Sequence, residues 1–214
     1  MPRKPLCSAL ALVLGLCAVG QVAAQKLEHP KALEIGDTAV WSYVLKGTAL
    51  PFEERVVAVT DTEIRSTLRV GDRTFDAAVA TRDFSSLRGM SLASGEANVY
   101  SAPYAWFEFP LEAGKAWSGK TTSTEASYTC TLSYQTTVDG TERVTVPAGQ
   151  FDAFKLSGTE FIKCISKYGA PNLATSKYSY WVASVKDKVV MVKNEYHDSF
   201  GRSWSRELVS VDFK

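Results

Sequence analysis

The sequence predicts a mainly β protein of about ten antiparallel strands in a single domain. Short runs of β-branched and aromatic residues are separated by turn-forming pairs such as Asp61-Thr62 and Gly71-Asp72, a pattern typical of hairpins. Apolar residues alternate with polar ones along residues 128–146, as they do in a half-buried strand. No helical period of useful length accompanies these signals.

The first half of the domain contains four clear strand candidates, at residues 39–46, 55–60, 63–70 and 73–81. The first of them carries Trp41 and Tyr43 on one side of the pleat. Residues 82–96 are rich in serine and glycine and show no period. We therefore expect a long loop there, either a functional loop or a plain connector.

The second half contains one long hairpin that turns at Pro147-Ala148-Gly149. A three-residue turn of this chemistry pairs Val146 with Gln150 and sets Leu132 opposite Cys164. Cys130 then lies one diagonal step away on the same face, and a small bulge brings the two sulfurs together. We therefore predict a Cys130–Cys164 disulfide; the alternative is a pair of buried thiols. Further strands at residues 178–184, 189–196 and 203–213 complete the domain.

The first 24 residues have the features of a cleavable signal peptide. Arg3 and Lys4 precede an apolar run at residues 6–19, and small residues end the segment, so cleavage is expected between Ala24 and Gln25. An uncleaved anchor helix is the first alternative. A lipoprotein signal at Cys17 is the second, although Leu16 is large where a lipobox needs a small residue. Residues 1–24 are thus the leader, 25–35 a loose N-terminal lead and 36–214 the β domain, which is expected in the periplasm or secreted.

Net charge argues against some classes of partner. The chain has 24 basic and 23 acidic residues, and removal of Arg3 and Lys4 makes the mature charge slightly negative. Nucleic-acid binding calls for a strong basic excess, so no nucleic-acid partner is expected. The processed chain is also not expected to span a membrane: an outer-membrane barrel is disfavoured by charges such as Arg65, Arg69 and Lys155 within the strands.

No motif for catalysis, metal binding or a cofactor stands out, so we expect no enzyme activity, no metal and no cofactor. His29 and His197 are far apart in the sequence and lack metal-ligand spacing. Ser91 follows Gly89 in a stretch that lacks the closing glycine of a nucleophile elbow. Glu53 and Glu54 are adjacent on a strand and point to opposite faces, so they cannot act as an acid/base pair.

Aromatic residues are the feature with functional content. They cluster at residues 98–109 and again at 178–181. The candidate ligand-lining residues are Tyr100, Tyr104, Trp106, Phe107, Tyr180 and Trp181. Such side chains can line a groove for a lipophilic small molecule. The alternative is that they fill a β-sheet core and bind nothing.

Three stretches carry a resemblance to a known family. They are FPLEAGKAW at residues 109–117, VTVPAGQFDAFK at 144–155 and YWVA at 180–183. In this order they resemble exported bacterial proteins classed as a domain of unknown function and described as TapB-like. The resemblance covers roughly residues 109–212. It implies a strongly curled antiparallel sheet or half-barrel, with a β-sandwich as the alternative, and it supplies no active site.

These observations favour an exported, non-catalytic binding or envelope-associated module whose concave aromatic face holds a lipophilic molecule or an envelope protein. One alternative is a structural or interaction protein with a filled core and no ligand. Another is a hydrolase, which the missing Ser, His and Asp constellation argues against. The ligand, the oligomeric state and the choice between periplasm and exterior are not encoded in any motif.

Overall fold

Antiparallel β-strands make up the regular secondary structure of residues 26–90, 96–169 and 171–214, which are the residues that this computed structural model describes. The expected signal peptide and the Ala24–Gln25 cleavage site lie outside these ranges. The strands of the first half are β1 (Lys26–Leu27), β2 (Thr38–Leu45), β3 (Thr48–Val59), β4 (Glu63–Val70), β5 (Arg73–Thr81), β6 (Ser86–Met90) and β7 (Ala97–Tyr104). Those of the second half are β8 (Leu111–Glu112), β9 (Ala116–Thr124), β10 (Tyr128–Val146), β11 (Gly149–Ser166), β12 (Pro171–Val185), β13 (Lys188–Asp198) and β14 (Ser203–Asp212).

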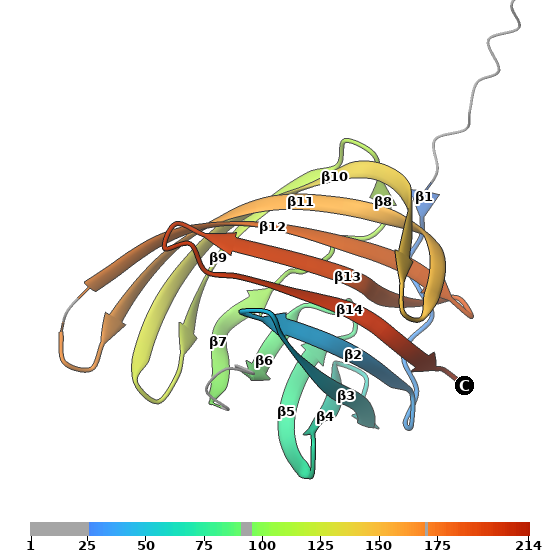
Figure 1. Ribbon diagram of the computed structural model, residues 1–214, viewed down its shortest axis with the longest axis horizontal. Coiled ribbons are helices and arrows are strands. Elements are labelled where there is room, and N and C mark those ends of the chain that lie inside the picture. The colour runs from blue at the N-terminus through green and yellow to red at the C-terminus, as the bar shows by residue number, and fades with distance from the viewer. Residues whose placement is uncertain (1–25, 91–95, 170) are drawn as a thin grey trace, which may run out of the picture.

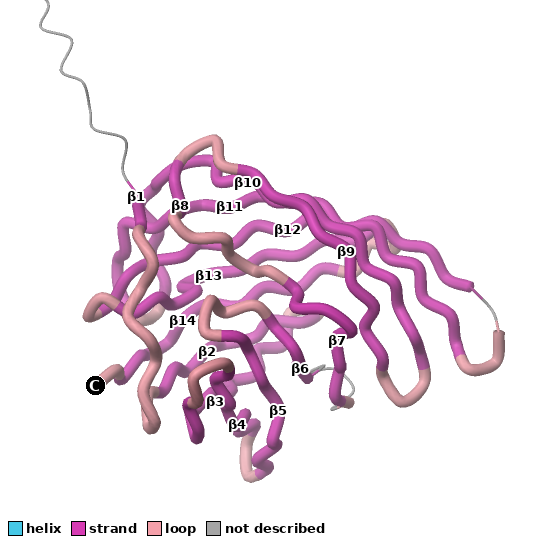
Figure 2. Tube along the Cα trace, turned by 180° about the vertical axis from the view of Figure 1, so that it is seen from behind, coloured by secondary structure: helices cyan, strands magenta, loops and turns pink. Residues whose placement is uncertain are grey.

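Twelve of these strands close into a barrel in the order β10-β11-β12-β13-β14-β2-β3-β4-β5-β6-β7-β9. Neighbours in the barrel are neighbours in the sequence except where β14 pairs with β2 and β7 pairs with β9. Strands β10–β13 form one wall, and strands β2–β7 form the opposite wall (Figures 1 and 2). The two remaining strands, β1 and β8, pair with each other, with Lys26 opposite Glu112.

The mainly β class is confirmed, but the open curled sheet or half-barrel of about ten strands is wrong, as is the β-sandwich. The barrel closes through short ladders that sequence patterns do not mark. Strand β6 lies in the segment interpreted as a loop, and β7 pairs with β9 only through Val99–Thr124 and Tyr100–Ser123. Alternation along a strand predicts which side chains share a face. It does not predict whether the two edge strands of the sheet pair and close it into a barrel.

The long hairpin of β10 and β11 has the predicted position with a different register. Its loop is Pro147-Ala148, since Val146 pairs with Gly149, so the expected three-residue turn is one residue too long. A bulge between Val138 and Gly140 shifts the register by one further residue. The two shifts place Cys130 directly opposite Cys164 with a Cα–Cα distance of 3.9 Å, and the predicted disulfide is present.

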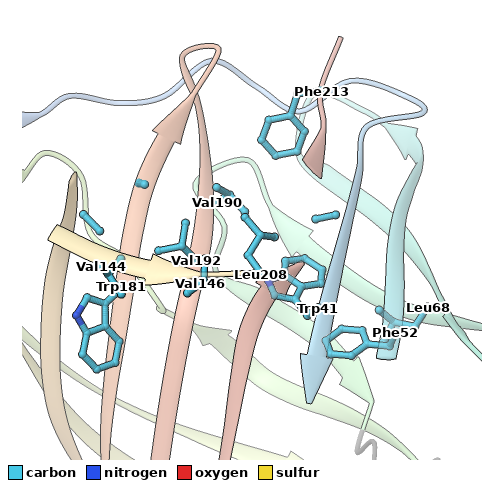
Figure 3. Packing of buried hydrophobic residues seen from close by; sticks show 13 residues of the cluster. Trp41, Phe52, Leu68, Val144, Val146, Trp181, Val190, Val192, Leu208 and Phe213 are labelled. Atoms are coloured by element: carbon cyan, nitrogen blue, oxygen red, sulfur yellow. The ribbon is translucent and has the colours of Figure 1, made fainter. Parts of the chain in front are cut away.

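The same bulge reverses which side chains at the end of β10 point to each face of the sheet. Before the bulge an even-numbered residue, Val138, shares a face with Leu156. After the bulge an odd-numbered residue, Thr141, occupies that face, where it pairs with Phe154. Val144 and Val146 therefore pack on the opposite face, in a cluster that includes Trp181 and Val192. Figure 3 shows the strand that carries these two valines crossing neighbouring strands toward Leu208. At the tip the Ala148 N–H donates to the Leu208 carbonyl oxygen over 3.0 Å.

A buried ion pair fastens the start of β2 to β13 and to the C-terminus. Lys188 and Asp37 are each 1% exposed, and Lys188 Nζ lies 2.8 Å from Asp37 Oδ2. Asp37 also accepts the backbone N–H of Glu34 at 2.7 Å and that of Lys214 at 2.9 Å. Burial alone would raise the pKa of the Asp37 carboxyl, but these hydrogen bonds outweigh burial and hold its pKa below the usual value.

Candidate functional site

A partly open cavity of about 510 Å³ lies inside the barrel, between the β2–β7 wall and the strands β13 and β14. This volume lies within the range of about 300–1,000 Å³ that is common for small-molecule sites. Most of the side chains around it are apolar or aromatic. Those on the apolar wall include Leu33, Trp41, Phe52, Val56, Leu68, Ala78, Ala80, Met90, Val189, Val190 and Phe213.

Strand alternation places this apolar wall. Trp41 pairs with Phe52 across β2 and β3, and the two rings stack with centroids 5.3 Å apart. The Trp41 indole N–H donates to the Met191 carbonyl oxygen over 3.0 Å. Residues 188–192 lie beyond the β13–β14 ladder, which begins at Lys193–Glu207. The indole therefore gives Met191 the hydrogen bond that β14 does not provide, and the tryptophan is held in place.

Three of the six predicted aromatic residues line this cavity: Tyr100, Trp106 and Phe107. Trp106 is fixed by donating its indole N–H to Ser86 Oγ over 2.5 Å. Phe107 is 6% exposed and belongs to a hydrophobic cluster with Tyr104 and Leu111, against which the partly buried Tyr100 also packs. The cavity thus receives side chains from the aromatic segment at residues 98–109, as the hypothesis of an aromatic-lined face requires.

The other three predicted residues lie elsewhere. Tyr104 and Tyr180 are buried core residues whose rings pack on Trp106, with centroids 4.9 and 5.3 Å away. They support the cavity wall from behind. Trp181 points to the opposite face of β12 from Tyr180, because successive residues of a strand alternate. Its indole N–H donates to Glu142 Oε1 over 2.5 Å, so it does not join the other aromatic residues.

Polar side chains also line the cavity. Arg206, Glu54, Asn98, Glu125 and the exposed Arg88 all line it. Burial raises the pKa of the Glu54 carboxyl, while a hydrogen bond with Ser66 and the charge of Arg206 oppose that rise. Burial also lowers the pKa of the Arg206 guanidinium. Glu53, by contrast, lies on the other side of the strand, where it binds Arg69 at 2.8 Å, so the predicted divergence of Glu53 and Glu54 is confirmed.

Several tyrosines surround the buried carboxyl group of Glu160. Glu160 pairs with Tyr134 on β10 and with Ser176 on β12, and it is 9% exposed. Burial raises the pKa of Glu160 to about 7, although hydrogen bonds from Tyr104 and Ser176 favour its ionised form. Burial is also the main cause that raises the pKa of Tyr178 and of Tyr100 to about 12. These hydroxyl groups are therefore neutral at physiological pH.

The charged residues inside the barrel were missed by sequence reasoning, although the alternation contains a signal for each. Arg206 has the same parity as Trp204 and Leu208, and Glu160 has that of Leu156 and Ile162. Glu54 lies between Phe52 and Val56 in the same way. A charged residue at an inward position of an alternating strand is an exception that indicates a buried polar site.

A second hollow of about 930 Å³ lies over β9–β13. Its rim is built from exposed hydroxyl and basic side chains, among them Lys120, Lys177 and His197. His29 does not line this hollow, and its ring centroid lies 5.6 Å from that of Phe109. Among residues 26–90, 96–169 and 171–214, no three His, Cys, Asp or Glu side chains gather in a way that could hold a metal ion. No helix in the same ranges has the length and apolar character to cross a membrane.

Comparisons with known proteins give a fold relationship. No protein-family model matches the chain, and no curated protein matches it. A solved structure of a protein described as a candidate lipoprotein, from Parabacteroides distasonis, matches with a TM-score of 0.50 and 13% identity, over 85% of this chain and 97% of that one. The hypothetical lipoprotein YmcC from Escherichia coli matches with a TM-score of 0.45 and 10% identity, over 82% and 85% of the two chains. A candidate exported protein with a YmcC-like fold from Bacteroides fragilis matches with a TM-score of 0.39 and 10% identity, over 86% and 99% of the two chains. The first of these shows that the fold also occurs in a protein of that description.

Proposed function

We propose that this protein is an exported, non-catalytic binding module that holds a lipophilic small molecule inside its barrel. The observation that carries the proposal is the cavity of about 510 Å³, walled by apolar side chains and by Tyr100, Trp106 and Phe107. Concave, mostly apolar pockets with a few polar groups are the usual form of small-molecule sites. The signal-like residues 1–24 support an envelope location, and the Parabacteroides distasonis neighbour is itself described as a candidate lipoprotein.

Binding of a neutral apolar dye, Nile red, tests this proposal. The mature protein is expected to bind it with a blue-shifted, enhanced fluorescence. Ala78 lines the cavity on β5, so Ala78→Phe is expected to fill part of the volume and to weaken binding about tenfold or more, in line with the loss of one or two buried apolar groups. Ala49 on β3 is exposed, and Ala49→Phe is the matched control that should retain the wild-type affinity. Equal dye affinity for both variants would argue against the cavity.

A structural role without a ligand is the second candidate. Four buried tyrosines favour this role, because they fill the part of the barrel in which they lie. They are each 4–6% exposed: Tyr104, Tyr134, Tyr178 and Tyr180. This candidate predicts that the dye does not bind to the wild-type protein at all. It also predicts that Ala78→Phe strengthens the fold by filling empty volume, as cavity filling commonly does.

A further inference from the structure

We propose that the ligand is an amphiphile with a single anionic headgroup, and that Arg206 binds this headgroup while the apolar wall of the cavity holds the chain. The inference rests on the proposed binding function and goes beyond it by naming the chemical class of the ligand. It stands on the position of Arg206, on the acceptors that its guanidinium has within the protein, and on the separation of Arg206 from Glu54.

Arg206 lies at the centre of a row of inward side chains that runs across three strands. It pairs with Asn194 on β13 and with Tyr43 on β2. Its guanidinium carbon lies 5.4 Å from the centre of the Trp41 ring. Arg206, Tyr43 and Trp41 all line the cavity, so the guanidinium is oriented by aromatic neighbours next to the empty volume.

The hydrogen-bonding capacity of Arg206 is largely unused. Its Nη2 lies 2.7 Å from the Met191 sulfur, and a thioether is a weak acceptor. Its Nε is buried, and no group in the described part of the chain accepts a hydrogen bond from it. The neighbouring Asn194 donates to the Ser179 carbonyl oxygen, but its Oδ1 is buried and likewise lacks a donor among the described residues. Buried polar groups of this kind are costly unless something binds them.

Glu54 does not neutralise Arg206 by contact. Glu54 pairs with Ala39, while Arg206 pairs with Tyr43, four residues further along β2. The stacked Trp41–Phe52 pair lies between Glu54 and Arg206 along the strands. The Glu54 carboxyl group has its hydrogen bond with Ser66, and it interacts with Arg206 through charge and not through a hydrogen bond. A ligand carboxylate or phosphate would give the guanidinium the planar, charged acceptor that it lacks.

Paired ligands that differ only in the headgroup test this inference. Dodecanoate and dodecan-1-ol would compete with Nile red for the mature protein at neutral pH, and inorganic phosphate would be a third competitor. Arg206→Met keeps the length and apolar stem of the side chain and removes the charge. Arg55→Met is the matched control, because Arg55 lies on β3 with its side chain 56% exposed.

The expected result is that Arg206→Met weakens dodecanoate binding about 10- to 100-fold, as the loss of a charge-assisted hydrogen bond does. Dodecan-1-ol should bind both proteins alike, which also shows that the variant is folded. Arg55→Met should leave both ligands unaffected, and inorganic phosphate should not displace dodecanoate. Equal dodecanoate binding by the wild type and Arg206→Met would overturn the inference and leave the proposed function intact. Displacement of dodecanoate by inorganic phosphate would have the same two consequences. If neither Nile red nor dodecan-1-ol binds the wild type, the proposed function fails and the inference with it.

Discussion

The ring of Tyr178 lies flat against the backbone of Gly158 on the neighbouring strand. The two residues are directly paired across β11 and β12, and a Cβ atom added at Gly158 would lie 2.2 Å from the tyrosine ring. The Tyr178 hydroxyl group then reaches β10, where it lies 2.8 Å from Thr136 Oγ1 and donates to the Gln135 carbonyl oxygen at 3.1 Å. Tyr134 and Gly119 repeat the arrangement one strand pair away. A strand glycine and a tyrosine thus act as one packing unit.

Gly158→Ala is expected to lower the free energy of unfolding by about 1–3 kcal/mol, the usual cost of overpacking. Urea unfolding followed by tryptophan fluorescence measures it. Gly89→Ala is the control, since no heavy atom lies within 4 Å of its added Cβ. In the double variant with Tyr178→Leu the cost of Gly158→Ala should largely disappear. A cost that is the same in both backgrounds would show that the ring and the glycine are not coupled.

Replacement of both cysteines, Cys130→Ser with Cys164→Ser, is expected to lower the free energy of unfolding by about 3–4 kcal/mol. The disulfide closes a loop with a sequence separation of 34 residues, so its loss gives the unfolded chain more conformational freedom. Urea unfolding with and without a reductant provides the measurement. The reductant should destabilise the wild type and leave the variant unchanged. No effect of the reductant on the wild type would contradict a stabilising disulfide.

Lys188→Met is expected to lower the free energy of unfolding by about 3–5 kcal/mol, because it leaves the Asp37 carboxylate buried without its cation. Thermal and urea unfolding measure the loss. Lys31 provides a control, since its ion pair with Asp187 at 2.8 Å has side chains 67% and 75% exposed, and Lys31→Met should cost less than about 1 kcal/mol. Asp37→Leu combined with Lys188→Met should be less harmful than Lys188→Met alone. Equal losses at Lys188 and Lys31 would contradict this view of the pair.

The stability of the protein should decrease as pH rises from 4.5 to about 7 through the titration of Glu160. In this window the folded protein holds a proton on Glu160 that the unfolded chain releases, so the folded state binds more protons and loses stability as pH increases. Each unit of pKa elevation corresponds to about 1.4 kcal/mol. Glu160→Gln should remove this part of the pH dependence and be more stable than the wild type above neutral pH. Parallel urea titrations at both ends of the window, with the exposed Glu108→Gln as control, would detect the difference; identical pH profiles for the wild type and Glu160→Gln would refute the assignment.

Local patterns predicted the parts of the fold that depend on neighbouring residues. The alternation along β10 and the Pro147 turn placed the long hairpin, and the hairpin placed Cys130 near Cys164. The bulge at residue 139 could not be seen, because the even-numbered apolar residues continue through it. Val138 and Val144 have the same parity and are both buried, yet they pack in different clusters. A pattern of burial does not reveal which face a residue is buried on.

The candidate site could be predicted only in part, because aromatic character does not reveal which face of a strand a side chain occupies. The aromatic character of Tyr100, Trp106 and Phe107 predicts a ligand-lining role, and the structure brings these three residues to one cavity. The same character predicts this role for Trp181, which lies on the other face of its strand and does not line the cavity. The cavity itself depends on barrel closure through the short strands β6 and β7, whose pairings carry little sequence signal. The inward position of Arg206 could be predicted from the alternation along its strand. Its lack of a carboxylate partner could not, because that depends on contacts between distant strands.

Native mass spectrometry of the protein purified from its own envelope tests the central claim, which is that the barrel cavity binds a lipophilic molecule. The mature chain is expected to retain a bound species that is released on unfolding and extracted into organic solvent, and Ala78→Phe purified in parallel should retain much less of it. A wild-type protein that carries no bound molecule under the same mild conditions, and that binds no apolar dye afterwards, would contradict the claim.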